Sequence, residues 1–206
     1  MFYSCGELTS LDLSKWDVSN VTTISHMFAD CFKLEYLNLK GWDTSSLVVM
    51  DCIFNDCHSL TELDVSSFDT ANCNEFTQVF ESCRNLETIV GLDKWDTGNA
   101  RTYEELFSGC AVLKEVDLST FDTSKVKDTQ YMFNGCSSLQ TIYVGDGWDM
   151  SSLQWDGAMF TGCRSLVGGA GTVFNSAKTN GEYARLDGGP DTPGYLTHIK
   201  DRPVTP

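Results

Sequence analysis

Hydrophobic residues recur along this chain with a period of 26 or 27 residues, and this period organises the sequence. Each unit contains a phenylalanine with an apolar residue before it and a cysteine three residues after it. A fixed period of this length is typical of a solenoid, in which each repeat buries its apolar face only against its neighbours. The seven cysteines of the pattern are Cys5, Cys31, Cys57, Cys83, Cys110, Cys136 and Cys163.

Two shorter patterns predict the elements within a unit. After the cysteine comes Leu-x-x-Leu-x-Leu, and its alternation with period two predicts a short strand with one apolar face. Strands are expected at 11–13, 37–39, 63–65, 116–118 and 142–144. At the end of the unit, Ile24, Met27, Phe28 and Cys31 have the spacing i, i+3, i+4 and i+7, which predicts a helix or helical turn of about two turns.

An aromatic residue followed by aspartate marks a corner between the strand and the helical turn. The aspartates of this column are Asp17, Asp43, Asp69, Asp96, Asp122 and Asp149. Each is expected to accept hydrogen bonds from backbone N–H groups one to three residues later, as in an Asx-turn or N-cap. A ladder of bound cations is the alternative interpretation. The fourth and sixth units are one residue longer, and both contain glycine, which suits a bulge at a corner.

The consensus CxxLxxLxLSxWDTSxV followed by MFxxC resembles the BspA-like leucine-rich repeats, which are bacterial surface proteins with 26-residue repeats. The resemblance covers residues 1 to about 166, and the segment 183–197 resembles the closing segment of such arrays. It implies an α/β solenoid of leucine-rich-repeat type on the cell surface, with roles in adhesion. We expect a right-handed coil of about seven repeats over 1–166, with one parallel sheet face, a C-terminal cap over 167–199 and a linker or tail over 200–206.

The chain carries a net charge of −15, which disfavours nucleic acids and anionic membranes as partners. No apolar stretch of about 18 residues is present, so no membrane insertion is expected. The sequence begins inside a repeat, and we interpret it as a monomeric part of a longer extracellular protein whose signal and anchor lie outside it.

The periodic cysteines are expected to be buried and reduced, because parallel Cβ vectors on stacked coils hold the Cβ atoms about 5 Å apart, beyond the disulfide optimum. Cys73 is expected in the core, and Cys52, at a variable position, is expected to be the exposed thiol. The sequence contains no C-x-x-C pair of the kind that binds zinc, and no metal or cofactor is expected.

Catalysis has little support, since His26, His58 and His198 do not recur with a nucleophile or base, so an enzyme is not expected. The outward strand positions offer a mostly acidic surface with tyrosines that suits a protein ligand. Its candidate residues are Asp12, Tyr36, Asn38, Glu62, Asp64, Glu115, Asp117 and Tyr143. Two functions remain open: a module that binds a protein partner in adhesion or host interaction, and a structural spacer with no ligand of its own.

Overall fold

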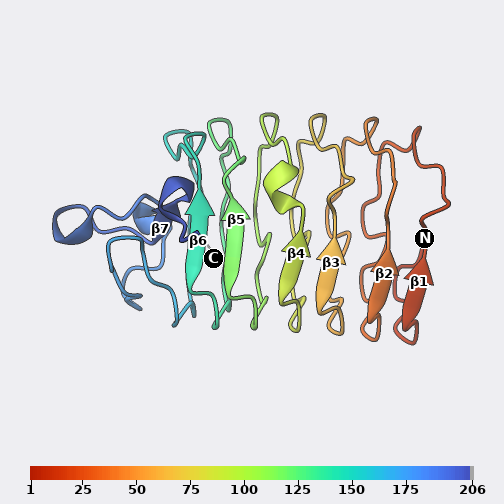
Figure 1. Cartoon of the computed structure of the whole chain (residues 1–206), viewed down its shortest axis with the longest axis horizontal. Coiled ribbons are helices and arrows are strands. Elements are labelled where there is room, and N and C mark those ends of the chain that lie inside the picture. Colours follow the sequence, from red (N-terminus) through yellow and green to blue (C-terminus); the bar gives the residue numbers. More distant parts are fainter. Residues whose placement is uncertain (205–206) are drawn as a thin grey trace.

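The computed structural model describes residues 1–204, which form a row of stacked coils with the strands side by side on one face (Figure 1). Leu11 lies opposite Leu37 and Val116 opposite Ile142, the register that a 26-residue repeat requires. Every strand pair is parallel, so the predicted solenoid with parallel strands is confirmed. The strands are β1 (Ser10–Asp12), β2 (Tyr36–Asn38), β3 (Glu62–Asp64), β4 (Thr88–Val90), β5 (Glu115–Leu118), β6 (Thr141–Val144) and β7 (Leu196–His198).

The strand face differs from the prediction in two respects. The five predicted strands all begin one residue earlier than expected, and β4 and β7 were not predicted. The prediction of one sheet was wrong, because hydrogen bonding divides the face into β1-β2, β3-β4 and β5-β6-β7. On the return side of the coil, single parallel bridges link successive coils from Thr23 through Val49 and onward to Trp155. The coils are therefore joined on two sides.

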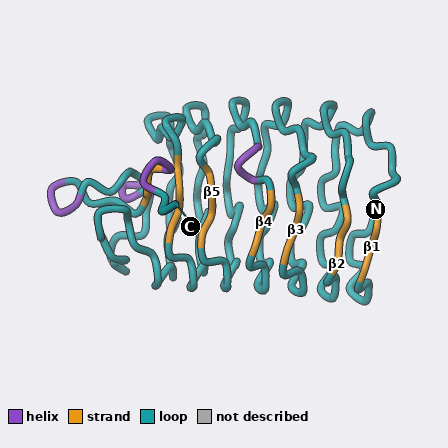
Figure 2. Tube along the Cα trace, in the orientation of Figure 1, coloured by secondary structure: helices purple, strands orange, loops and turns teal. Residues whose placement is uncertain are grey.

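The helix predicted from Ile24 to Cys31 was also wrong: residues 1–204 contain no α-helix, and loops and turns connect the strands (Figure 2). Backbone N–H groups alternate between two kinds of partner. Met27 N–H donates to Ile24 three residues back, whereas Phe28 N–H donates to Ile53 in the next coil. His26 and Asp30 have positive φ, which interrupts helical geometry. Stacked coils thus supply the acceptors that a helix would supply internally, while the i, i+3, i+4, i+7 residues still face inward.

Aromatic rings form the centre of the core. The phenylalanine of each unit stacks on that of the next, with centroid distances of 5.5–5.9 Å. A second column stacks Trp42, Phe68, Trp95 and Phe121 at 6.2–6.5 Å. Each interior ring therefore buries both faces against its sequence equivalents, as nearest-neighbour stacking in a solenoid requires.

The cysteines are all free, and the periodic ones are buried from Cys31 onward. The buried thiols also donate hydrogen bonds: Cys83 Sγ lies 3.1 Å from the carbonyl oxygen of Phe54 in the preceding coil. Cys73 is buried as expected, but the expectation for Cys52 was wrong, since it is 8% exposed and donates to Gln78. Burial raises the pKa of the Cys52 thiol to about 11. Cys5 is the exposed thiol.

Beyond residue 166 the chain covers the last coil. Tyr195 is fully buried, packs edge-on against Phe160 with ring centroids 5.2 Å apart, and lies beside Tyr183. Three short 3₁₀ turns occur here: η2 (Gly181–Tyr183), η3 (Gly189–Asp191) and η4 (Ile199–Asp201). The segment predicted as a linker or tail begins within η4, and its last two residues lie outside the described residues. No helix in residues 1–204 has the length and apolarity to cross a membrane.

Candidate functional site

The outward residues of β1 to β6 share one face, as the alternation predicted. Tyr36 is 54% exposed, and Glu62 and Asp64 on the next strand are exposed as well. Leu37, the residue after Tyr36, and Leu63, between Glu62 and Asp64, are buried in the core. Near β2 and β3 the predicted surface is therefore accessible, with a tyrosine beside two carboxylates.

The third residue of several strands has a structural role that the sequence analysis missed. Its side chain accepts a hydrogen bond from the backbone N–H two residues later, as in an Asx-turn. These contacts join Asp12 to Ser14 (2.9 Å), Asn38 to Lys40 (3.1 Å), Asp64 to Ser66 (2.9 Å) and Asp117 to Ser119 (3.0 Å). The hydrogen bonds from serine lower the pKa of the Asp12 and Asp64 carboxyls, so both are ionised and held in a fixed direction at neutral pH.

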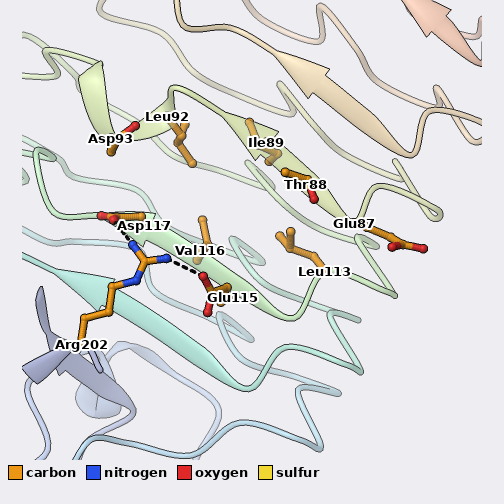
Figure 3. Close-up of a pocket in the computed structure, with 10 residues that line it drawn as sticks. All are labelled: Glu87, Thr88, Ile89, Leu92, Asp93, Leu113, Glu115, Val116, Asp117 and Arg202. Carbon is orange, nitrogen blue, oxygen red and sulfur yellow. Dashed lines mark hydrogen bonds and ion pairs between the residues drawn. The ribbon is translucent and has the colours of Figure 1, made fainter. Parts of the chain in front are cut away.

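Tyr143 does not lie on an open surface, so that prediction was wrong. It is 6% exposed, and the guanidinium carbon of Arg202 lies 4.8 Å from its ring centroid. The same guanidinium donates to two predicted site residues: Nη1 to Asp117 Oδ2 at 2.7 Å, and Nη2 to Glu115 Oε1 at 2.5 Å. The chain's own C-terminal segment thus occupies the strand face at β5 and β6. Figure 3 shows Arg202 beside Asp117 and Glu115 of β5.

A pocket of about 220 Å³ lies between β4 and β5, next to Arg202 (Figure 3). Here the extra residue of the fourth unit forms the 3₁₀ turn η1 (Leu92–Lys94) after Gly91, and β4 and β5 are not hydrogen-bonded. Gly91 has φ +88°, and a Cβ there would lie 2.3 Å from the Cα of Ser66. The insertion that the sequence placed at a corner therefore lies beside this gap in the strand face.

The extra loop of the sixth unit anchors the C-terminal segment. Asp146, in the Gly-Asp-Gly insertion, lies 3.0 Å from His198 Nε2 and 3.3 Å from Lys200 Nζ. These contacts lower the pKa of the Asp146 carboxyl, chiefly through the hydrogen bond from His198. The sequence analysis missed Arg202 and Asp146, because the contacts that unite them span more than 50 residues and lie outside the repeat.

The aspartate column caps the corners, which confirms that prediction. Each carboxylate accepts from the backbone N–H two residues later at 2.8–3.1 Å. Threonines next to the column donate to the following coil, as Thr70 Oγ1 does to the carbonyl of Asp96 at 2.7 Å. In the described part of the chain, no group of three or more His, Cys, Asp or Glu residues is placed to hold a metal ion.

Two histidines have carboxylate partners. His58 Nε2 lies 2.9 Å from Asp56, and His198 contacts Asp146 as described above. Within residues 1–204 neither histidine is hydrogen-bonded to a serine, threonine or cysteine side chain. The pairs therefore lack the nucleophile that a hydrolytic arrangement needs.

Comparisons with known proteins identify a family and one structural likeness. The family model described as "Mycoplasma protein of unknown function, DUF285" matches residues 1–91 and 87–180. No curated protein matches the chain. A crystal structure of a leucine-rich repeat protein from Bacteroides ovatus ATCC 8483 is similar to 74% of this chain, with 20% identity and a TM-score of 0.38. The match covers 43% of that protein's chain.

Proposed function

This chain belongs to the DUF285 family of Mycoplasma proteins of unknown function, and we propose that it is a non-enzymatic module that binds a protein partner on its strand face. The observation that carries the proposal is the exposed group of Tyr36, Glu62 and Asp64 on adjacent strands, in which the tyrosine occurs at no other equivalent strand position. A tyrosine presents a large amphipathic surface with few rotatable bonds, and such residues dominate the energy of protein interfaces.

The scaffold beneath this group is rigid. Leu37 and Leu63 anchor the two strands in the core, and the Asp64 carboxylate is fixed by its bond to Ser66. A contact surface held in one conformation loses less entropy on binding than a mobile loop does. The geometry therefore suits recognition of a folded or extended protein segment.

The charge narrows the class of partner. With a net charge of −15, the chain attracts basic protein surfaces and repels phosphates. The resemblance to BspA-like repeats favours an extracellular setting and a role in adhesion or host interaction. A structural spacer is the competing function, and it requires no partner at all.

A capture screen separates these functions. The chain is immobilised and exposed to a panel of extracellular-matrix and cell-surface proteins at low ionic strength, where acidic contacts are strongest. The variant Tyr36→Ala plus Asp64→Lys removes the aromatic anchor and reverses one charge on the strand face. We expect this variant to lose at least about tenfold in affinity for the captured partner, because such anchors typically carry 1–2 kcal/mol or more.

The matched control is Tyr131→Ala plus Asp191→Lys. Tyr131 is 40% exposed on a turn outside the strands, and Asp191 is an exposed residue of η3. The control has the same composition and charge change and is expected to bind like the original chain. Equal losses for the two variants would mean that the strand face is not the site, and failure to capture any protein would favour the spacer.

A further inference from the structure

The pocket between β4 and β5 combines an apolar floor with an acidic rim. Leu92, Leu113 and Val116 line its base and are at most 4% exposed. Its lining also includes four carboxylates, on Glu87, Asp93, Glu115 and Asp117, and a single cation, Arg202. In Figure 3, Asp93 and Asp117 lie toward one end of the pocket and Glu87 toward the other, with Glu115 between them beside Arg202. Such a lining fits a side chain that has an aliphatic stem and a positive head.

The contacts of Arg202 show which cationic group, guanidinium or ammonium, the site fits. Two different guanidinium nitrogens donate to Asp117 and Glu115, at 2.7 and 2.5 Å, while the guanidinium carbon lies over the Tyr143 ring, 4.8 Å from its centroid. A planar fork satisfies two carboxylates and stacks on a ring at the same time, whereas a lysine ammonium is a compact point charge without that shape. The geometry therefore fits a guanidinium better than an ammonium.

Another arginine side chain could displace Arg202 from these contacts. The side chains of Arg202 and Glu115 remain 39% and 56% exposed, and that of Asp117 is 20% exposed. Exposed ion pairs contribute little net stability, because water and salt compete with them. Within residues 1–204, Glu87 and Asp93 form no ion pair, so the pocket keeps excess negative charge even with Arg202 in place.

We propose that Glu115, Asp117 and Tyr143, beside this pocket, form an arginine-recognition site that the chain's own Arg202 occupies in cis, and that an arginine side chain of a protein partner competes for the same position. The inference rests on the proposed function, and it specifies the partner as one that presents arginine in an exposed segment. Asp146, His198 and Lys200 hold the C-terminal segment in position, so that displacing Arg202 does not require the cap to unfold.

A peptide titration tests the site without any knowledge of the natural partner. The probe is acetyl-Ser-Gly-Arg-Gly-Ser-amide, with lysine and citrulline versions as controls, followed by chemical-shift changes at the amides of Ile89 and Val116. In the Arg202→Ala variant we expect binding at least about threefold tighter than in the original chain, because the competing side chain is absent. The lysine peptide should bind more weakly, and the citrulline peptide should produce no shift.

A second variant distinguishes the carboxylates from the rest of the pocket. Glu115→Gln plus Asp117→Asn, added to Arg202→Ala, removes the negative charge and keeps a capping oxygen at position 117, as Asn38 does in β2. We expect loss of the shifts with the thermal stability unchanged. Equal binding of the arginine and lysine peptides, no gain on Arg202→Ala, or full binding by the charge-neutral variant would each overturn the proposal.

The outcome is independent of the capture screen. Peptide binding without any captured protein would uphold the arginine site and count against the proposed function. A partner that depends on Tyr36 but not on Glu115 and Asp117, together with no peptide binding, would uphold the function and overturn the arginine site.

Discussion

Replacing Phe107 with alanine removes one ring from the middle of the phenylalanine column. The ring is fully buried and lies between Phe80 and Phe133, at centroid distances of 5.5 and 5.6 Å. Truncating a buried phenylalanine costs about 3–5 kcal/mol in lost burial and cavity formation. Each stacked neighbour adds about 0.5–1.5 kcal/mol. Because both faces of the ring lose a partner, we expect a loss of at least about 4 kcal/mol in the free energy of unfolding.

The assay is equilibrium unfolding in urea, followed by tryptophan fluorescence and by circular dichroism to test for a single transition. Two variants calibrate it. Phe107→Leu leaves a smaller cavity and should cost clearly less, whereas Tyr36→Ala, at an exposed ring, should change stability by no more than about 0.5 kcal/mol. A loss below about 1 kcal/mol for Phe107→Ala, or one equal to that of Tyr36→Ala, would refute the stacked-core account.

Three further predictions test other parts of the structure. A thiol reagent should modify one cysteine of the native chain, Cys5, and all nine after denaturation. The variant Cys5→Ser should abolish the native reaction, and several rapidly reacting thiols in the native chain would contradict the burial of the other cysteines. Gly91→Ala should lower the free energy of unfolding by several kcal/mol, because the added Cβ meets the neighbouring coil. Gly41→Ala, at φ +83° with nothing within 4 Å of the added Cβ, should lower it by about 1–2 kcal/mol. Equal losses in urea unfolding would contradict the close approach at Gly91. Burial raises the pKa of the Glu81 carboxyl, so the folded chain gains stability as pH falls from 7 toward about 5. The pKa of the Asp64 carboxyl is lowered, so the stability that its ionised form contributes is lost below about pH 4. Calorimetric melting temperatures should therefore rise as pH falls from 7 and fall again below about pH 4, and a steady fall from pH 7 to 4 would contradict this sign.

The sequence predicted those features that the repeat itself carries. The inward direction of Leu37 and Leu63 and the capping by the aspartate column follow from local spacing, and the structure has both. The helix at Ile24–Cys31 was wrong for a physical reason: its apolar spacing also fits consecutive turns. The choice between helix and turns depends on whether a neighbouring coil offers carbonyl acceptors, as Ile53 does for Phe28.

The candidate site was predictable only in part. Tyr36, Glu62 and Asp64 are exposed because each lies next to an inward residue of its strand, which alternation alone reveals. Tyr143 is buried where it contacts Arg202, 59 positions later, and β7, both outside the repeat, so no periodic signal indicates its burial. The variable position of Cys52 in the repeat likewise did not indicate that the neighbouring coil covers it. Its burial depends on the turn conformation, in which Cys52 has a positive φ.

Hydrogen–deuterium exchange of the chain, with and without a partner captured in the screen, tests the central claim most directly. If the strand face binds the partner, protection should increase at residues 36–38 and 62–64 and remain unchanged in the turn that contains Tyr131. Protection confined to that turn, with both strands unaffected, would contradict the claim.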